Sequence, residues 1–121
     1  MDDRVGPVVV DRANVEASAR GEGGDEGIIT RLITREKQSS VLLGLFSLAP
    51  GQRATFGLPH PNGMQEEIYY LLAGRLRVSW TGGEFIAETG QAILFPSGQT
   101  YYLETFGDGA VELVWTGYPA P

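Results

Sequence analysis

The stretch that decides the fold runs from Gly57 to Arg75 and reads GLPHPNGMQEEIYYLLAGR. It contains the only histidine of the chain, His60, and seven residues later Glu67, the second member of a Glu–Glu pair. An unbroken apolar run, residues 68–73, follows Glu67 and ends at Gly74. A histidine and a carboxylate at the start of a buried strand predict a small polar site beside an apolar wall, as in the binding pockets of β-barrels.

Both faces of this strand are largely apolar. Side chains alternate along a strand, so Glu67, Tyr69 and Leu71 share one face, and residues 68, 70 and 72 share the other. A strand with water outside would carry polar residues there, so we expect the N-terminal segment or a second subunit to cover it, and we favour a homodimer. A Glu67 carboxyl facing an apolar cavity would have a raised pKa and could act as an acid or a base.

The composition excludes several classes of protein. The length of 121 residues is typical of one domain, and the absence of cysteine excludes a disulfide framework. A net charge of −6 argues against nucleic acid as a partner, because phosphates require a basic surface. No apolar run approaches the ~20 residues that cross a bilayer, and no signal peptide is visible, so we expect a cytoplasmic protein without a membrane partner.

Short β-type runs separated by glycine and proline cover most of the chain and predict an all-β, antiparallel sandwich or barrel. The predicted strands are residues 7–11, 28–34, 40–48, 54–58, 67–72, 75–80, 85–87, 92–95, 101–105 and 110–116. Residues 12–19 could form one or two helical turns with Asp11 as N-cap. The prolines of the tail, residues 117–121, predict no regular structure there. We therefore divide the chain into an N-terminal extension, residues 1–27, with a short strand and a glycine-rich loop, and a β-barrel domain, residues 28–121.

Two stretches resemble the two sequence motifs of the cupin superfamily. In the first motif, His60 and Glu67 match the first histidine and the glutamate, and Asn62 stands where the second histidine belongs. In the second motif, residues 90–98 keep the glycine, proline and glycine in register, and Tyr101 stands in place of the histidine. The resemblance covers roughly residues 42–115. It implies a jelly-roll (cupin-type) barrel and also favours a homodimer.

The resemblance also implies a place for a metal. In cupins with complete motifs, three histidines and the glutamate hold one divalent ion such as iron, manganese, nickel or zinc. Here His60 and Glu67 are ordinary ligands, Asn62 offers a neutral amide oxygen, and Tyr101 would have to lose a proton of ordinary pKa ~10. We therefore expect either no required cofactor or a weakly bound iron or zinc ion, with Tyr101 or Glu66 completing its shell.

The leading hypothesis is an enzyme that acts on a small oxygenated metabolite by lyase, isomerase or cyclase chemistry. Glu67 would be the general base or acid, His60 its partner, and Tyr101 a proton donor or a group that positions the substrate. Tyr69, Asn62 and Leu71 would complete the contacts with the small-molecule ligand. One alternative is a binding module without catalysis, and another is a weakly metal-bound oxygenase.

The tyrosines near the two motifs have two interpretations. Tyr69, Tyr101 and Tyr102 could line the pocket and stack on a ligand, or they could simply pack in the core.

Overall fold

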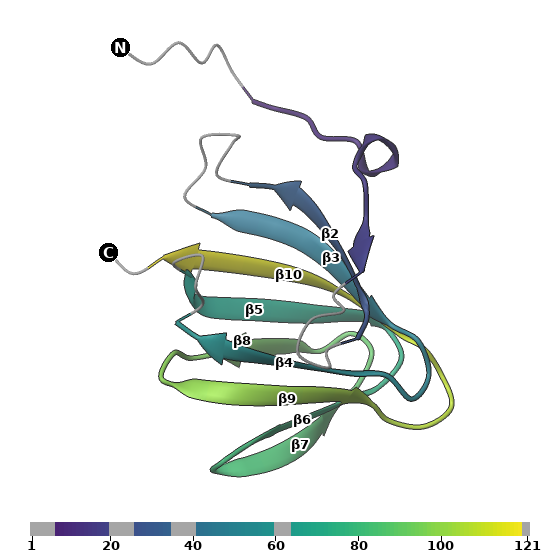
Figure 1. Ribbon diagram of the computed structural model, residues 1–121, viewed down its shortest axis with the longest axis vertical. Coiled ribbons are helices and arrows are strands. Elements are labelled where there is room, and N and C mark those ends of the chain that lie inside the picture. The colour runs from purple at the N-terminus through teal and green to yellow at the C-terminus, as the bar shows by residue number, and fades with distance from the viewer. Residues whose placement is uncertain (1–6, 20–25, 35–40, 60–63, 120–121) are drawn as a thin grey trace.

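The computed structural model describes residues 7–19, 26–34, 41–59 and 64–119, and its regular structure is almost entirely β (Figure 1). One 3₁₀ turn, η1 (Arg12–Asn14), precedes the strands. The strands are β1 (Ser18–Ala19), β2 (Ile28–Ile33), β3 (Leu42–Leu48), β4 (Arg53–Leu58), β5 (Met64–Ala73), β6 (Leu76–Trp80), β7 (Gly83–Ala87), β8 (Ala92–Phe95), β9 (Gln99–Thr105) and β10 (Val111–Pro119).

The strands form two antiparallel sheets that face each other. One sheet has the order β1-β2-β3-β10-β5-β8, and the other has the order β4-β9-β6-β7. Strands that are far apart in sequence therefore lie side by side, as β10 does between β3 and β5 (Figure 1). The chain also crosses from one sheet to the other, between β3 and β4 and between β9 and β10, as it does in a jelly roll. The predicted all-β, antiparallel jelly-roll fold is confirmed.

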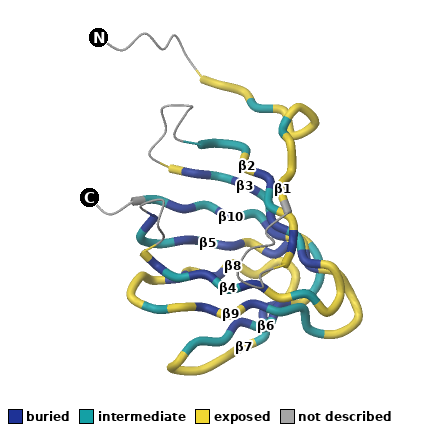
Figure 2. The backbone as a smooth tube through the Cα atoms, in the orientation of Figure 1, coloured by how far each residue is buried: buried dark blue, intermediate teal, exposed yellow. Residues whose placement is uncertain are grey.

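The core lies between the two sheets. Burial alternates residue by residue along β3, as expected for a strand with one face turned to the core. The same alternation occurs along β4 and β8, whereas β7 at the edge of its sheet is mostly exposed (Figure 2). The largest fully buried side chains are Phe95, Leu48, Met64, Leu71, Leu76, Leu103, Leu113, Val78 and Val111.

Two predictions at the chain ends were wrong. Residues 7–11 are not a strand, because the segment runs extended without pairing to another described strand, and the short strand of the extension is β1 instead. The helical region is limited to η1, and Asp11 caps it as predicted by accepting a hydrogen bond from the Ala13 amide at 2.9 Å.

The second wrong prediction concerns the tail, which was expected to be irregular. Strand β10 instead continues through Gly117 and Tyr118 to Pro119. The pairing of β10 with β5 is irregular between Tyr118 and Pro119, and a proline is tolerated at such a bulge.

The outer face of the six-stranded sheet is covered in part. A groove of about 230 Å³ lies on this outer face. Arg12 and Val15 of the N-terminal segment line one side of it, and Ile28 and Leu45 of the sheet line the other. Leu72 also lines this groove, while Tyr70 of the same strand remains 46% exposed. The N-terminal segment thus supplies some of the expected cover, and the homodimer stays a prediction.

Candidate functional site

Glu67 lies on the inner face of β5, between Gly117 of β10 and Phe95 of β8. Only 8% of the residue is exposed. Gly117 makes room for it, because a Cβ at that position would lie 3.4 Å from Glu67 Cγ and 3.0 Å from the sulfur of Met64. The sheet therefore holds a carboxyl group inside the sandwich, on the face that the alternation of the sequence predicted.

Four aromatic rings pack together between the two sheets, and we call Phe56, Tyr69, Phe95 and Tyr101 the aromatic cluster. They come from β4, β5, β8 and β9, so the cluster joins the two sheets. Phe95 is at its centre, with ring centroids 4.6 Å from Tyr69, 4.9 Å from Tyr101 and 5.1 Å from Phe56. Edge-to-face and tilted pairs at such distances are the favourable arrangements for aromatic rings. Two members of the cluster are neighbours of Glu67, because Phe95 is its cross-strand partner and Tyr69 follows it on the same face of β5.

Tyr101 is buried, and its hydroxyl group donates a hydrogen bond of 2.6 Å to the carbonyl oxygen of Pro96. Burial raises the pKa of the phenol above its ordinary value, and a side-chain hydrogen bond with Gln99 opposes part of that rise. The phenol is therefore neutral at pH 7. Its proton is already donated, so the oxygen offers a ligand mainly its accepting lone pair.

The other predicted residues fall into three groups. Tyr69 and Leu71 lie buried on the same inner face as Glu67. His60 and Asn62 lie outside the described residues, so their predicted roles stay predictions. Tyr102 does not line the interior: it is 51% exposed on the outer face of its sheet, because its neighbour Tyr101 points inward.

The described donors do not by themselves make a metal site. Within residues 7–19, 26–34, 41–59 and 64–119, no group of three or more histidine, cysteine, aspartate or glutamate side chains could hold an ion. Of the four cupin ligand positions, Glu67 supplies the one anionic donor there, and the neutral Tyr101 phenol is a poor ligand.

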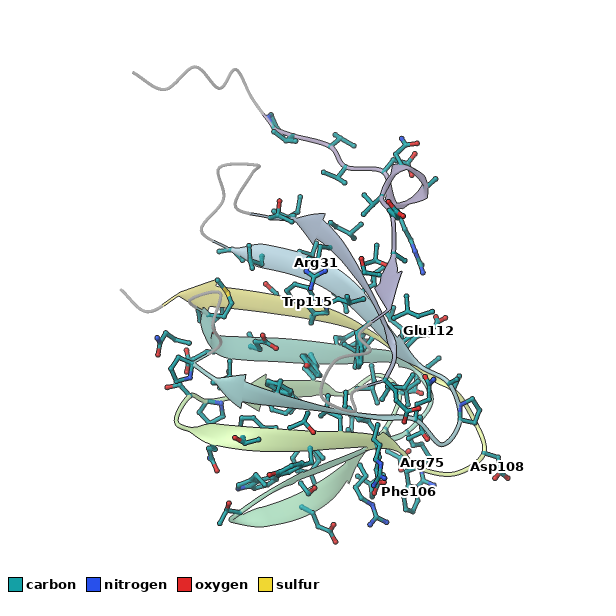
Figure 3. All side chains as sticks on the ribbon, in the orientation of Figure 1. Arg31, Arg75, Phe106, Asp108, Glu112 and Trp115 are labelled. Atoms are coloured by element: carbon teal, nitrogen blue, oxygen red, sulfur yellow. The ribbon has the colours of Figure 1, made fainter. Side chains whose placement is uncertain are left out.

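Trp115 was missed by the sequence analysis. It lies on the inner face of β10, between Gly44 of β3 and Tyr69 of β5, and Arg31 of β2 continues the same row (Figure 3). A Cβ at Gly44 would overlap the indole, so this glycine is what lets the ring lie down on β3. The indole nitrogen is buried without a hydrogen-bond partner in the described part of the chain.

Phe56 and Phe95 were also missed. Their signal was present, since both occupy inward positions of alternating strands, and Phe95 directly precedes the proline of the second motif.

In the described ranges no helix is long and apolar enough to span a membrane.

A two-sheet jelly roll with a carboxyl group and aromatic rings between its sheets defines a small cupin-type barrel. The chain matches the family model of the cupin domain, Cupin_2, over residues 44–117, and it belongs to that family.

Three known proteins are similar to this chain, and their names give different activities. The chain is 28% identical, over 93% of its length and 70% of the relative's, to the polyketide synthase CurC of Streptomyces cyaneus. Its fold is similar to that of the polyketide cyclase RemF of Streptomyces resistomycificus, with a TM-score of 0.75 at 20% identity over 94% of this chain and 80% of RemF. A predicted oxalate decarboxylase of Thermotoga maritima matches equally well, with a TM-score of 0.75 at 21% identity over 93% of this chain and all (100%) of that one. The shared fold therefore does not select the chemistry.

Proposed function

We propose that this protein is a cupin-type cyclase that closes a ring in a poly-oxygenated, polyketide-like substrate, with Glu67 as the general base. The observation that carries the proposal is the buried carboxyl group of Glu67 on the inner face of β5, against the aromatic cluster. The similarity to CurC, a polyketide synthase, extends over 93% of this chain and supports a polyketide-like substrate. RemF, which has the same fold, is a polyketide cyclase.

The reaction we propose is an intramolecular aldol closure. The Glu67 carboxylate takes a proton from a carbon next to a carbonyl group, and the C–H electrons become an enolate. The enolate carbon then forms a bond to a second carbonyl carbon of the same molecule, whose oxygen receives the displaced electron pair. The carboxylic acid of Glu67 returns its proton to that oxygen. Loss of the new hydroxyl group with a neighbouring hydrogen, as water, completes the ring.

The surroundings of Glu67 suit such a step. The rings of Tyr69 and Phe95 exclude water, which strengthens the interaction of the carboxylate with an acidic C–H group. We assign Tyr101, whose hydroxyl proton is donated to the Pro96 carbonyl oxygen, the role of accepting a hydrogen bond from an enol hydroxyl group. His60 remains the predicted partner of Glu67.

The test uses an aryl triketone, with ketones on alternate carbons, whose terminal methyl can close onto the ketone next to the aryl ring. The variant is Glu67→Gln, which keeps the size of the side chain but removes the base. Its matched control is Glu112→Gln, because Glu112 lies on β10, the strand beside β5, and is exposed on the outer face of the sheet. Loss of a general base lowers kcat by about 100-fold to 10,000-fold, and we expect such a loss only in the Glu67 variant.

Three outcomes would contradict the proposal. Equal turnover in wild type and the Glu67 variant would remove Glu67 from the mechanism, and an equal loss in both variants would point to a general effect on the fold. Binding of the triketone by the wild type without any turnover would favour the alternative of a binding module.

A further inference from the structure

Two large aromatic side chains face inward at one end of the sandwich and yet remain accessible. Trp80 follows Leu76 and Val78 on the inner face of β6, and Phe85 of β7 pairs with Val78 in register. Phe85 is 38% exposed and Trp80 is partly buried against the core. Inner-face aromatics are normally covered by the opposite sheet, so these two form an uncovered part of the interior.

The two rings continue the aromatic cluster outward. Phe85 meets Trp80 edge-to-face at 5.8 Å, and Trp80 lies 6.4 Å from Tyr101. Tyr101 lies 4.9 Å from Phe95, which is the cross-strand partner of Glu67. An unbroken row of rings therefore leads from the solvent-exposed edge of β7 to the buried carboxyl group.

The row of rings begins at the end of the sandwich where β5, the strand that carries Glu67, starts. Trp80 lies at the tip of the β6–β7 hairpin, at the same end as the last residue of β4 and the first residue of β5 (Figure 1). At that end, Leu58 of β4 pairs with Gln99 of β9, and Met64 of β5 pairs with Pro119 of β10. The opposite end differs in character.

At the opposite end, the guanidinium of Arg75 lies 4.7 Å from the centre of the Phe106 ring, and Arg75 also pairs with Glu88 at 2.9 Å (Figure 3). The surface at that end therefore carries charged side chains. The apolar approach to the interior is therefore at the Trp80 end.

The Trp80 indole is held in place by its own hairpin. A Cβ at Gly82 would lie 2.8 Å from the indole nitrogen, and one at Gly83 would lie 3.5 Å from a carbon of its six-membered ring. The ring thus lies close against a turn made of two glycines. A side chain fixed in this way loses little conformational freedom when a ligand stacks on it.

We propose that Trp80 and Phe85 form a stacking platform that binds a planar aromatic ring of the substrate, with the reactive ketones extending inward toward Glu67. This inference rests on the proposed cyclase function and names its substrate class: a molecule that already carries an aromatic ring. A reaction that forms that first ring must precede this one. Stacking suits the task, because aromatic faces attract one another in offset and edge-to-face arrangements.

The test measures binding of naphthol and of its saturated analogue decahydronaphthol, which has the same carbon skeleton but no planar ring. The variant is Phe85→Ala, with Phe85→Leu as a second variant that keeps apolar volume. The matched control is Tyr102→Ala, which removes an aromatic ring of similar exposure from the outer face of the same four-stranded sheet. Thermal unfolding of each variant verifies that the fold is retained.

We expect the wild type to prefer naphthol, and each Phe85 variant to bind it about threefold to tenfold more weakly, which is the effect of losing one aromatic partner. The Tyr102 variant should stay within about twofold of the wild type, and titration with naphthol should shift the indole N–H resonance of Trp80. Equal binding of the two probes, an unmoved Trp80 resonance, or an equal loss in the Tyr102 variant would overturn the inference.

Failure of this inference can be told apart from failure of the proposed function. If Glu67→Gln abolishes cyclisation while the Phe85 variants bind naphthol like the wild type, only the platform is refuted. If naphthol binding depends on Phe85 but the aryl triketone is never cyclised, the platform stands and the cyclase proposal is refuted.

Discussion

Adding one methyl group at Gly44 should destabilise the protein strongly, although this glycine has an ordinary strand conformation. The Cβ of an alanine there would lie 2.5 Å from the Cε2 atom of Trp115 and 2.5 Å from the carbonyl oxygen of Thr30. The Thr30 carbonyl belongs to the backbone of β2 and cannot swing away, so the indole and the strand must both shift. Overpacking of this kind costs about 1–3 kcal/mol.

A smaller effect opposes that cost. Replacing glycine by alanine stabilises a protein by about 0.4–1 kcal/mol when the alanine fits, because the unfolded chain loses freedom. We therefore expect Gly44→Ala to lower the free energy of unfolding by about 2 kcal/mol, the upper part of the overpacking range less this gain. For a chain of this size the midpoint of thermal unfolding should fall by roughly 6–10 °C.

Urea unfolding followed by tryptophan fluorescence measures this change directly, because the displaced ring is one of the two tryptophans of the chain. The matched control is Gly57→Ala in β4, where the nearest atom to the new Cβ within the described ranges is the Thr100 hydroxyl oxygen at 3.7 Å. That variant should be as stable as the wild type or slightly more stable. If the two variants unfolded at the same urea concentration, the placement of the Trp115 indole on Gly44 would be refuted.

Three further predictions concern the interior. Phe95→Ala removes the ring at the centre of the aromatic cluster, which is 1% exposed, and should cost about 3–5 kcal/mol in urea unfolding; a cost below about 1 kcal/mol would mean that the cluster is loosely packed. Tyr101 has a raised pKa in the folded state, so its contribution to stability is complete below pH ~10 and is lost as pH rises through the folded pKa, because the unfolded phenol ionises first. The difference in unfolding free energy between wild type and Tyr101→Phe should therefore shrink above pH ~10, and a difference that grew with pH would reverse the assigned sign. Protein purified without chelator should contain iron or zinc well below one ion per chain by elemental analysis, and one tightly held equivalent would contradict the weak-metal expectation.

Strand alternation allowed much of the interior to be predicted. The period of two in residues 67–72 placed Glu67, Tyr69 and Leu71 on one face, and the structure buries all three. The same alternation applies to the predicted strand 75–80, where Trp80 shares the inner face of β6 with Leu76 and Val78. These predictions succeeded because the direction of a side chain in a strand is a local property of the backbone.

Contacts between distant strands could not be predicted in this way. The meeting of Phe56 and Phe95 depends on how two sheets pack, and the seat of Trp115 on Gly44 depends on the register of β10 with β3. Neither the spacing nor the composition of one segment contains that information. The tail was misjudged for a similar reason, because pairing of Gly117 and Tyr118 with β5 outweighs the local preference of a proline-containing sequence.

A crystal structure of the Glu67→Gln variant soaked with the aryl triketone tests the central claim most directly. The account predicts the triketone between the two sheets, with its ketone chain within about 3 Å of the side-chain amide at position 67, a hydrogen-bond distance, and its aryl ring on Trp80 and Phe85. A triketone bound only on the outer face, in the groove beside Arg12, would contradict it.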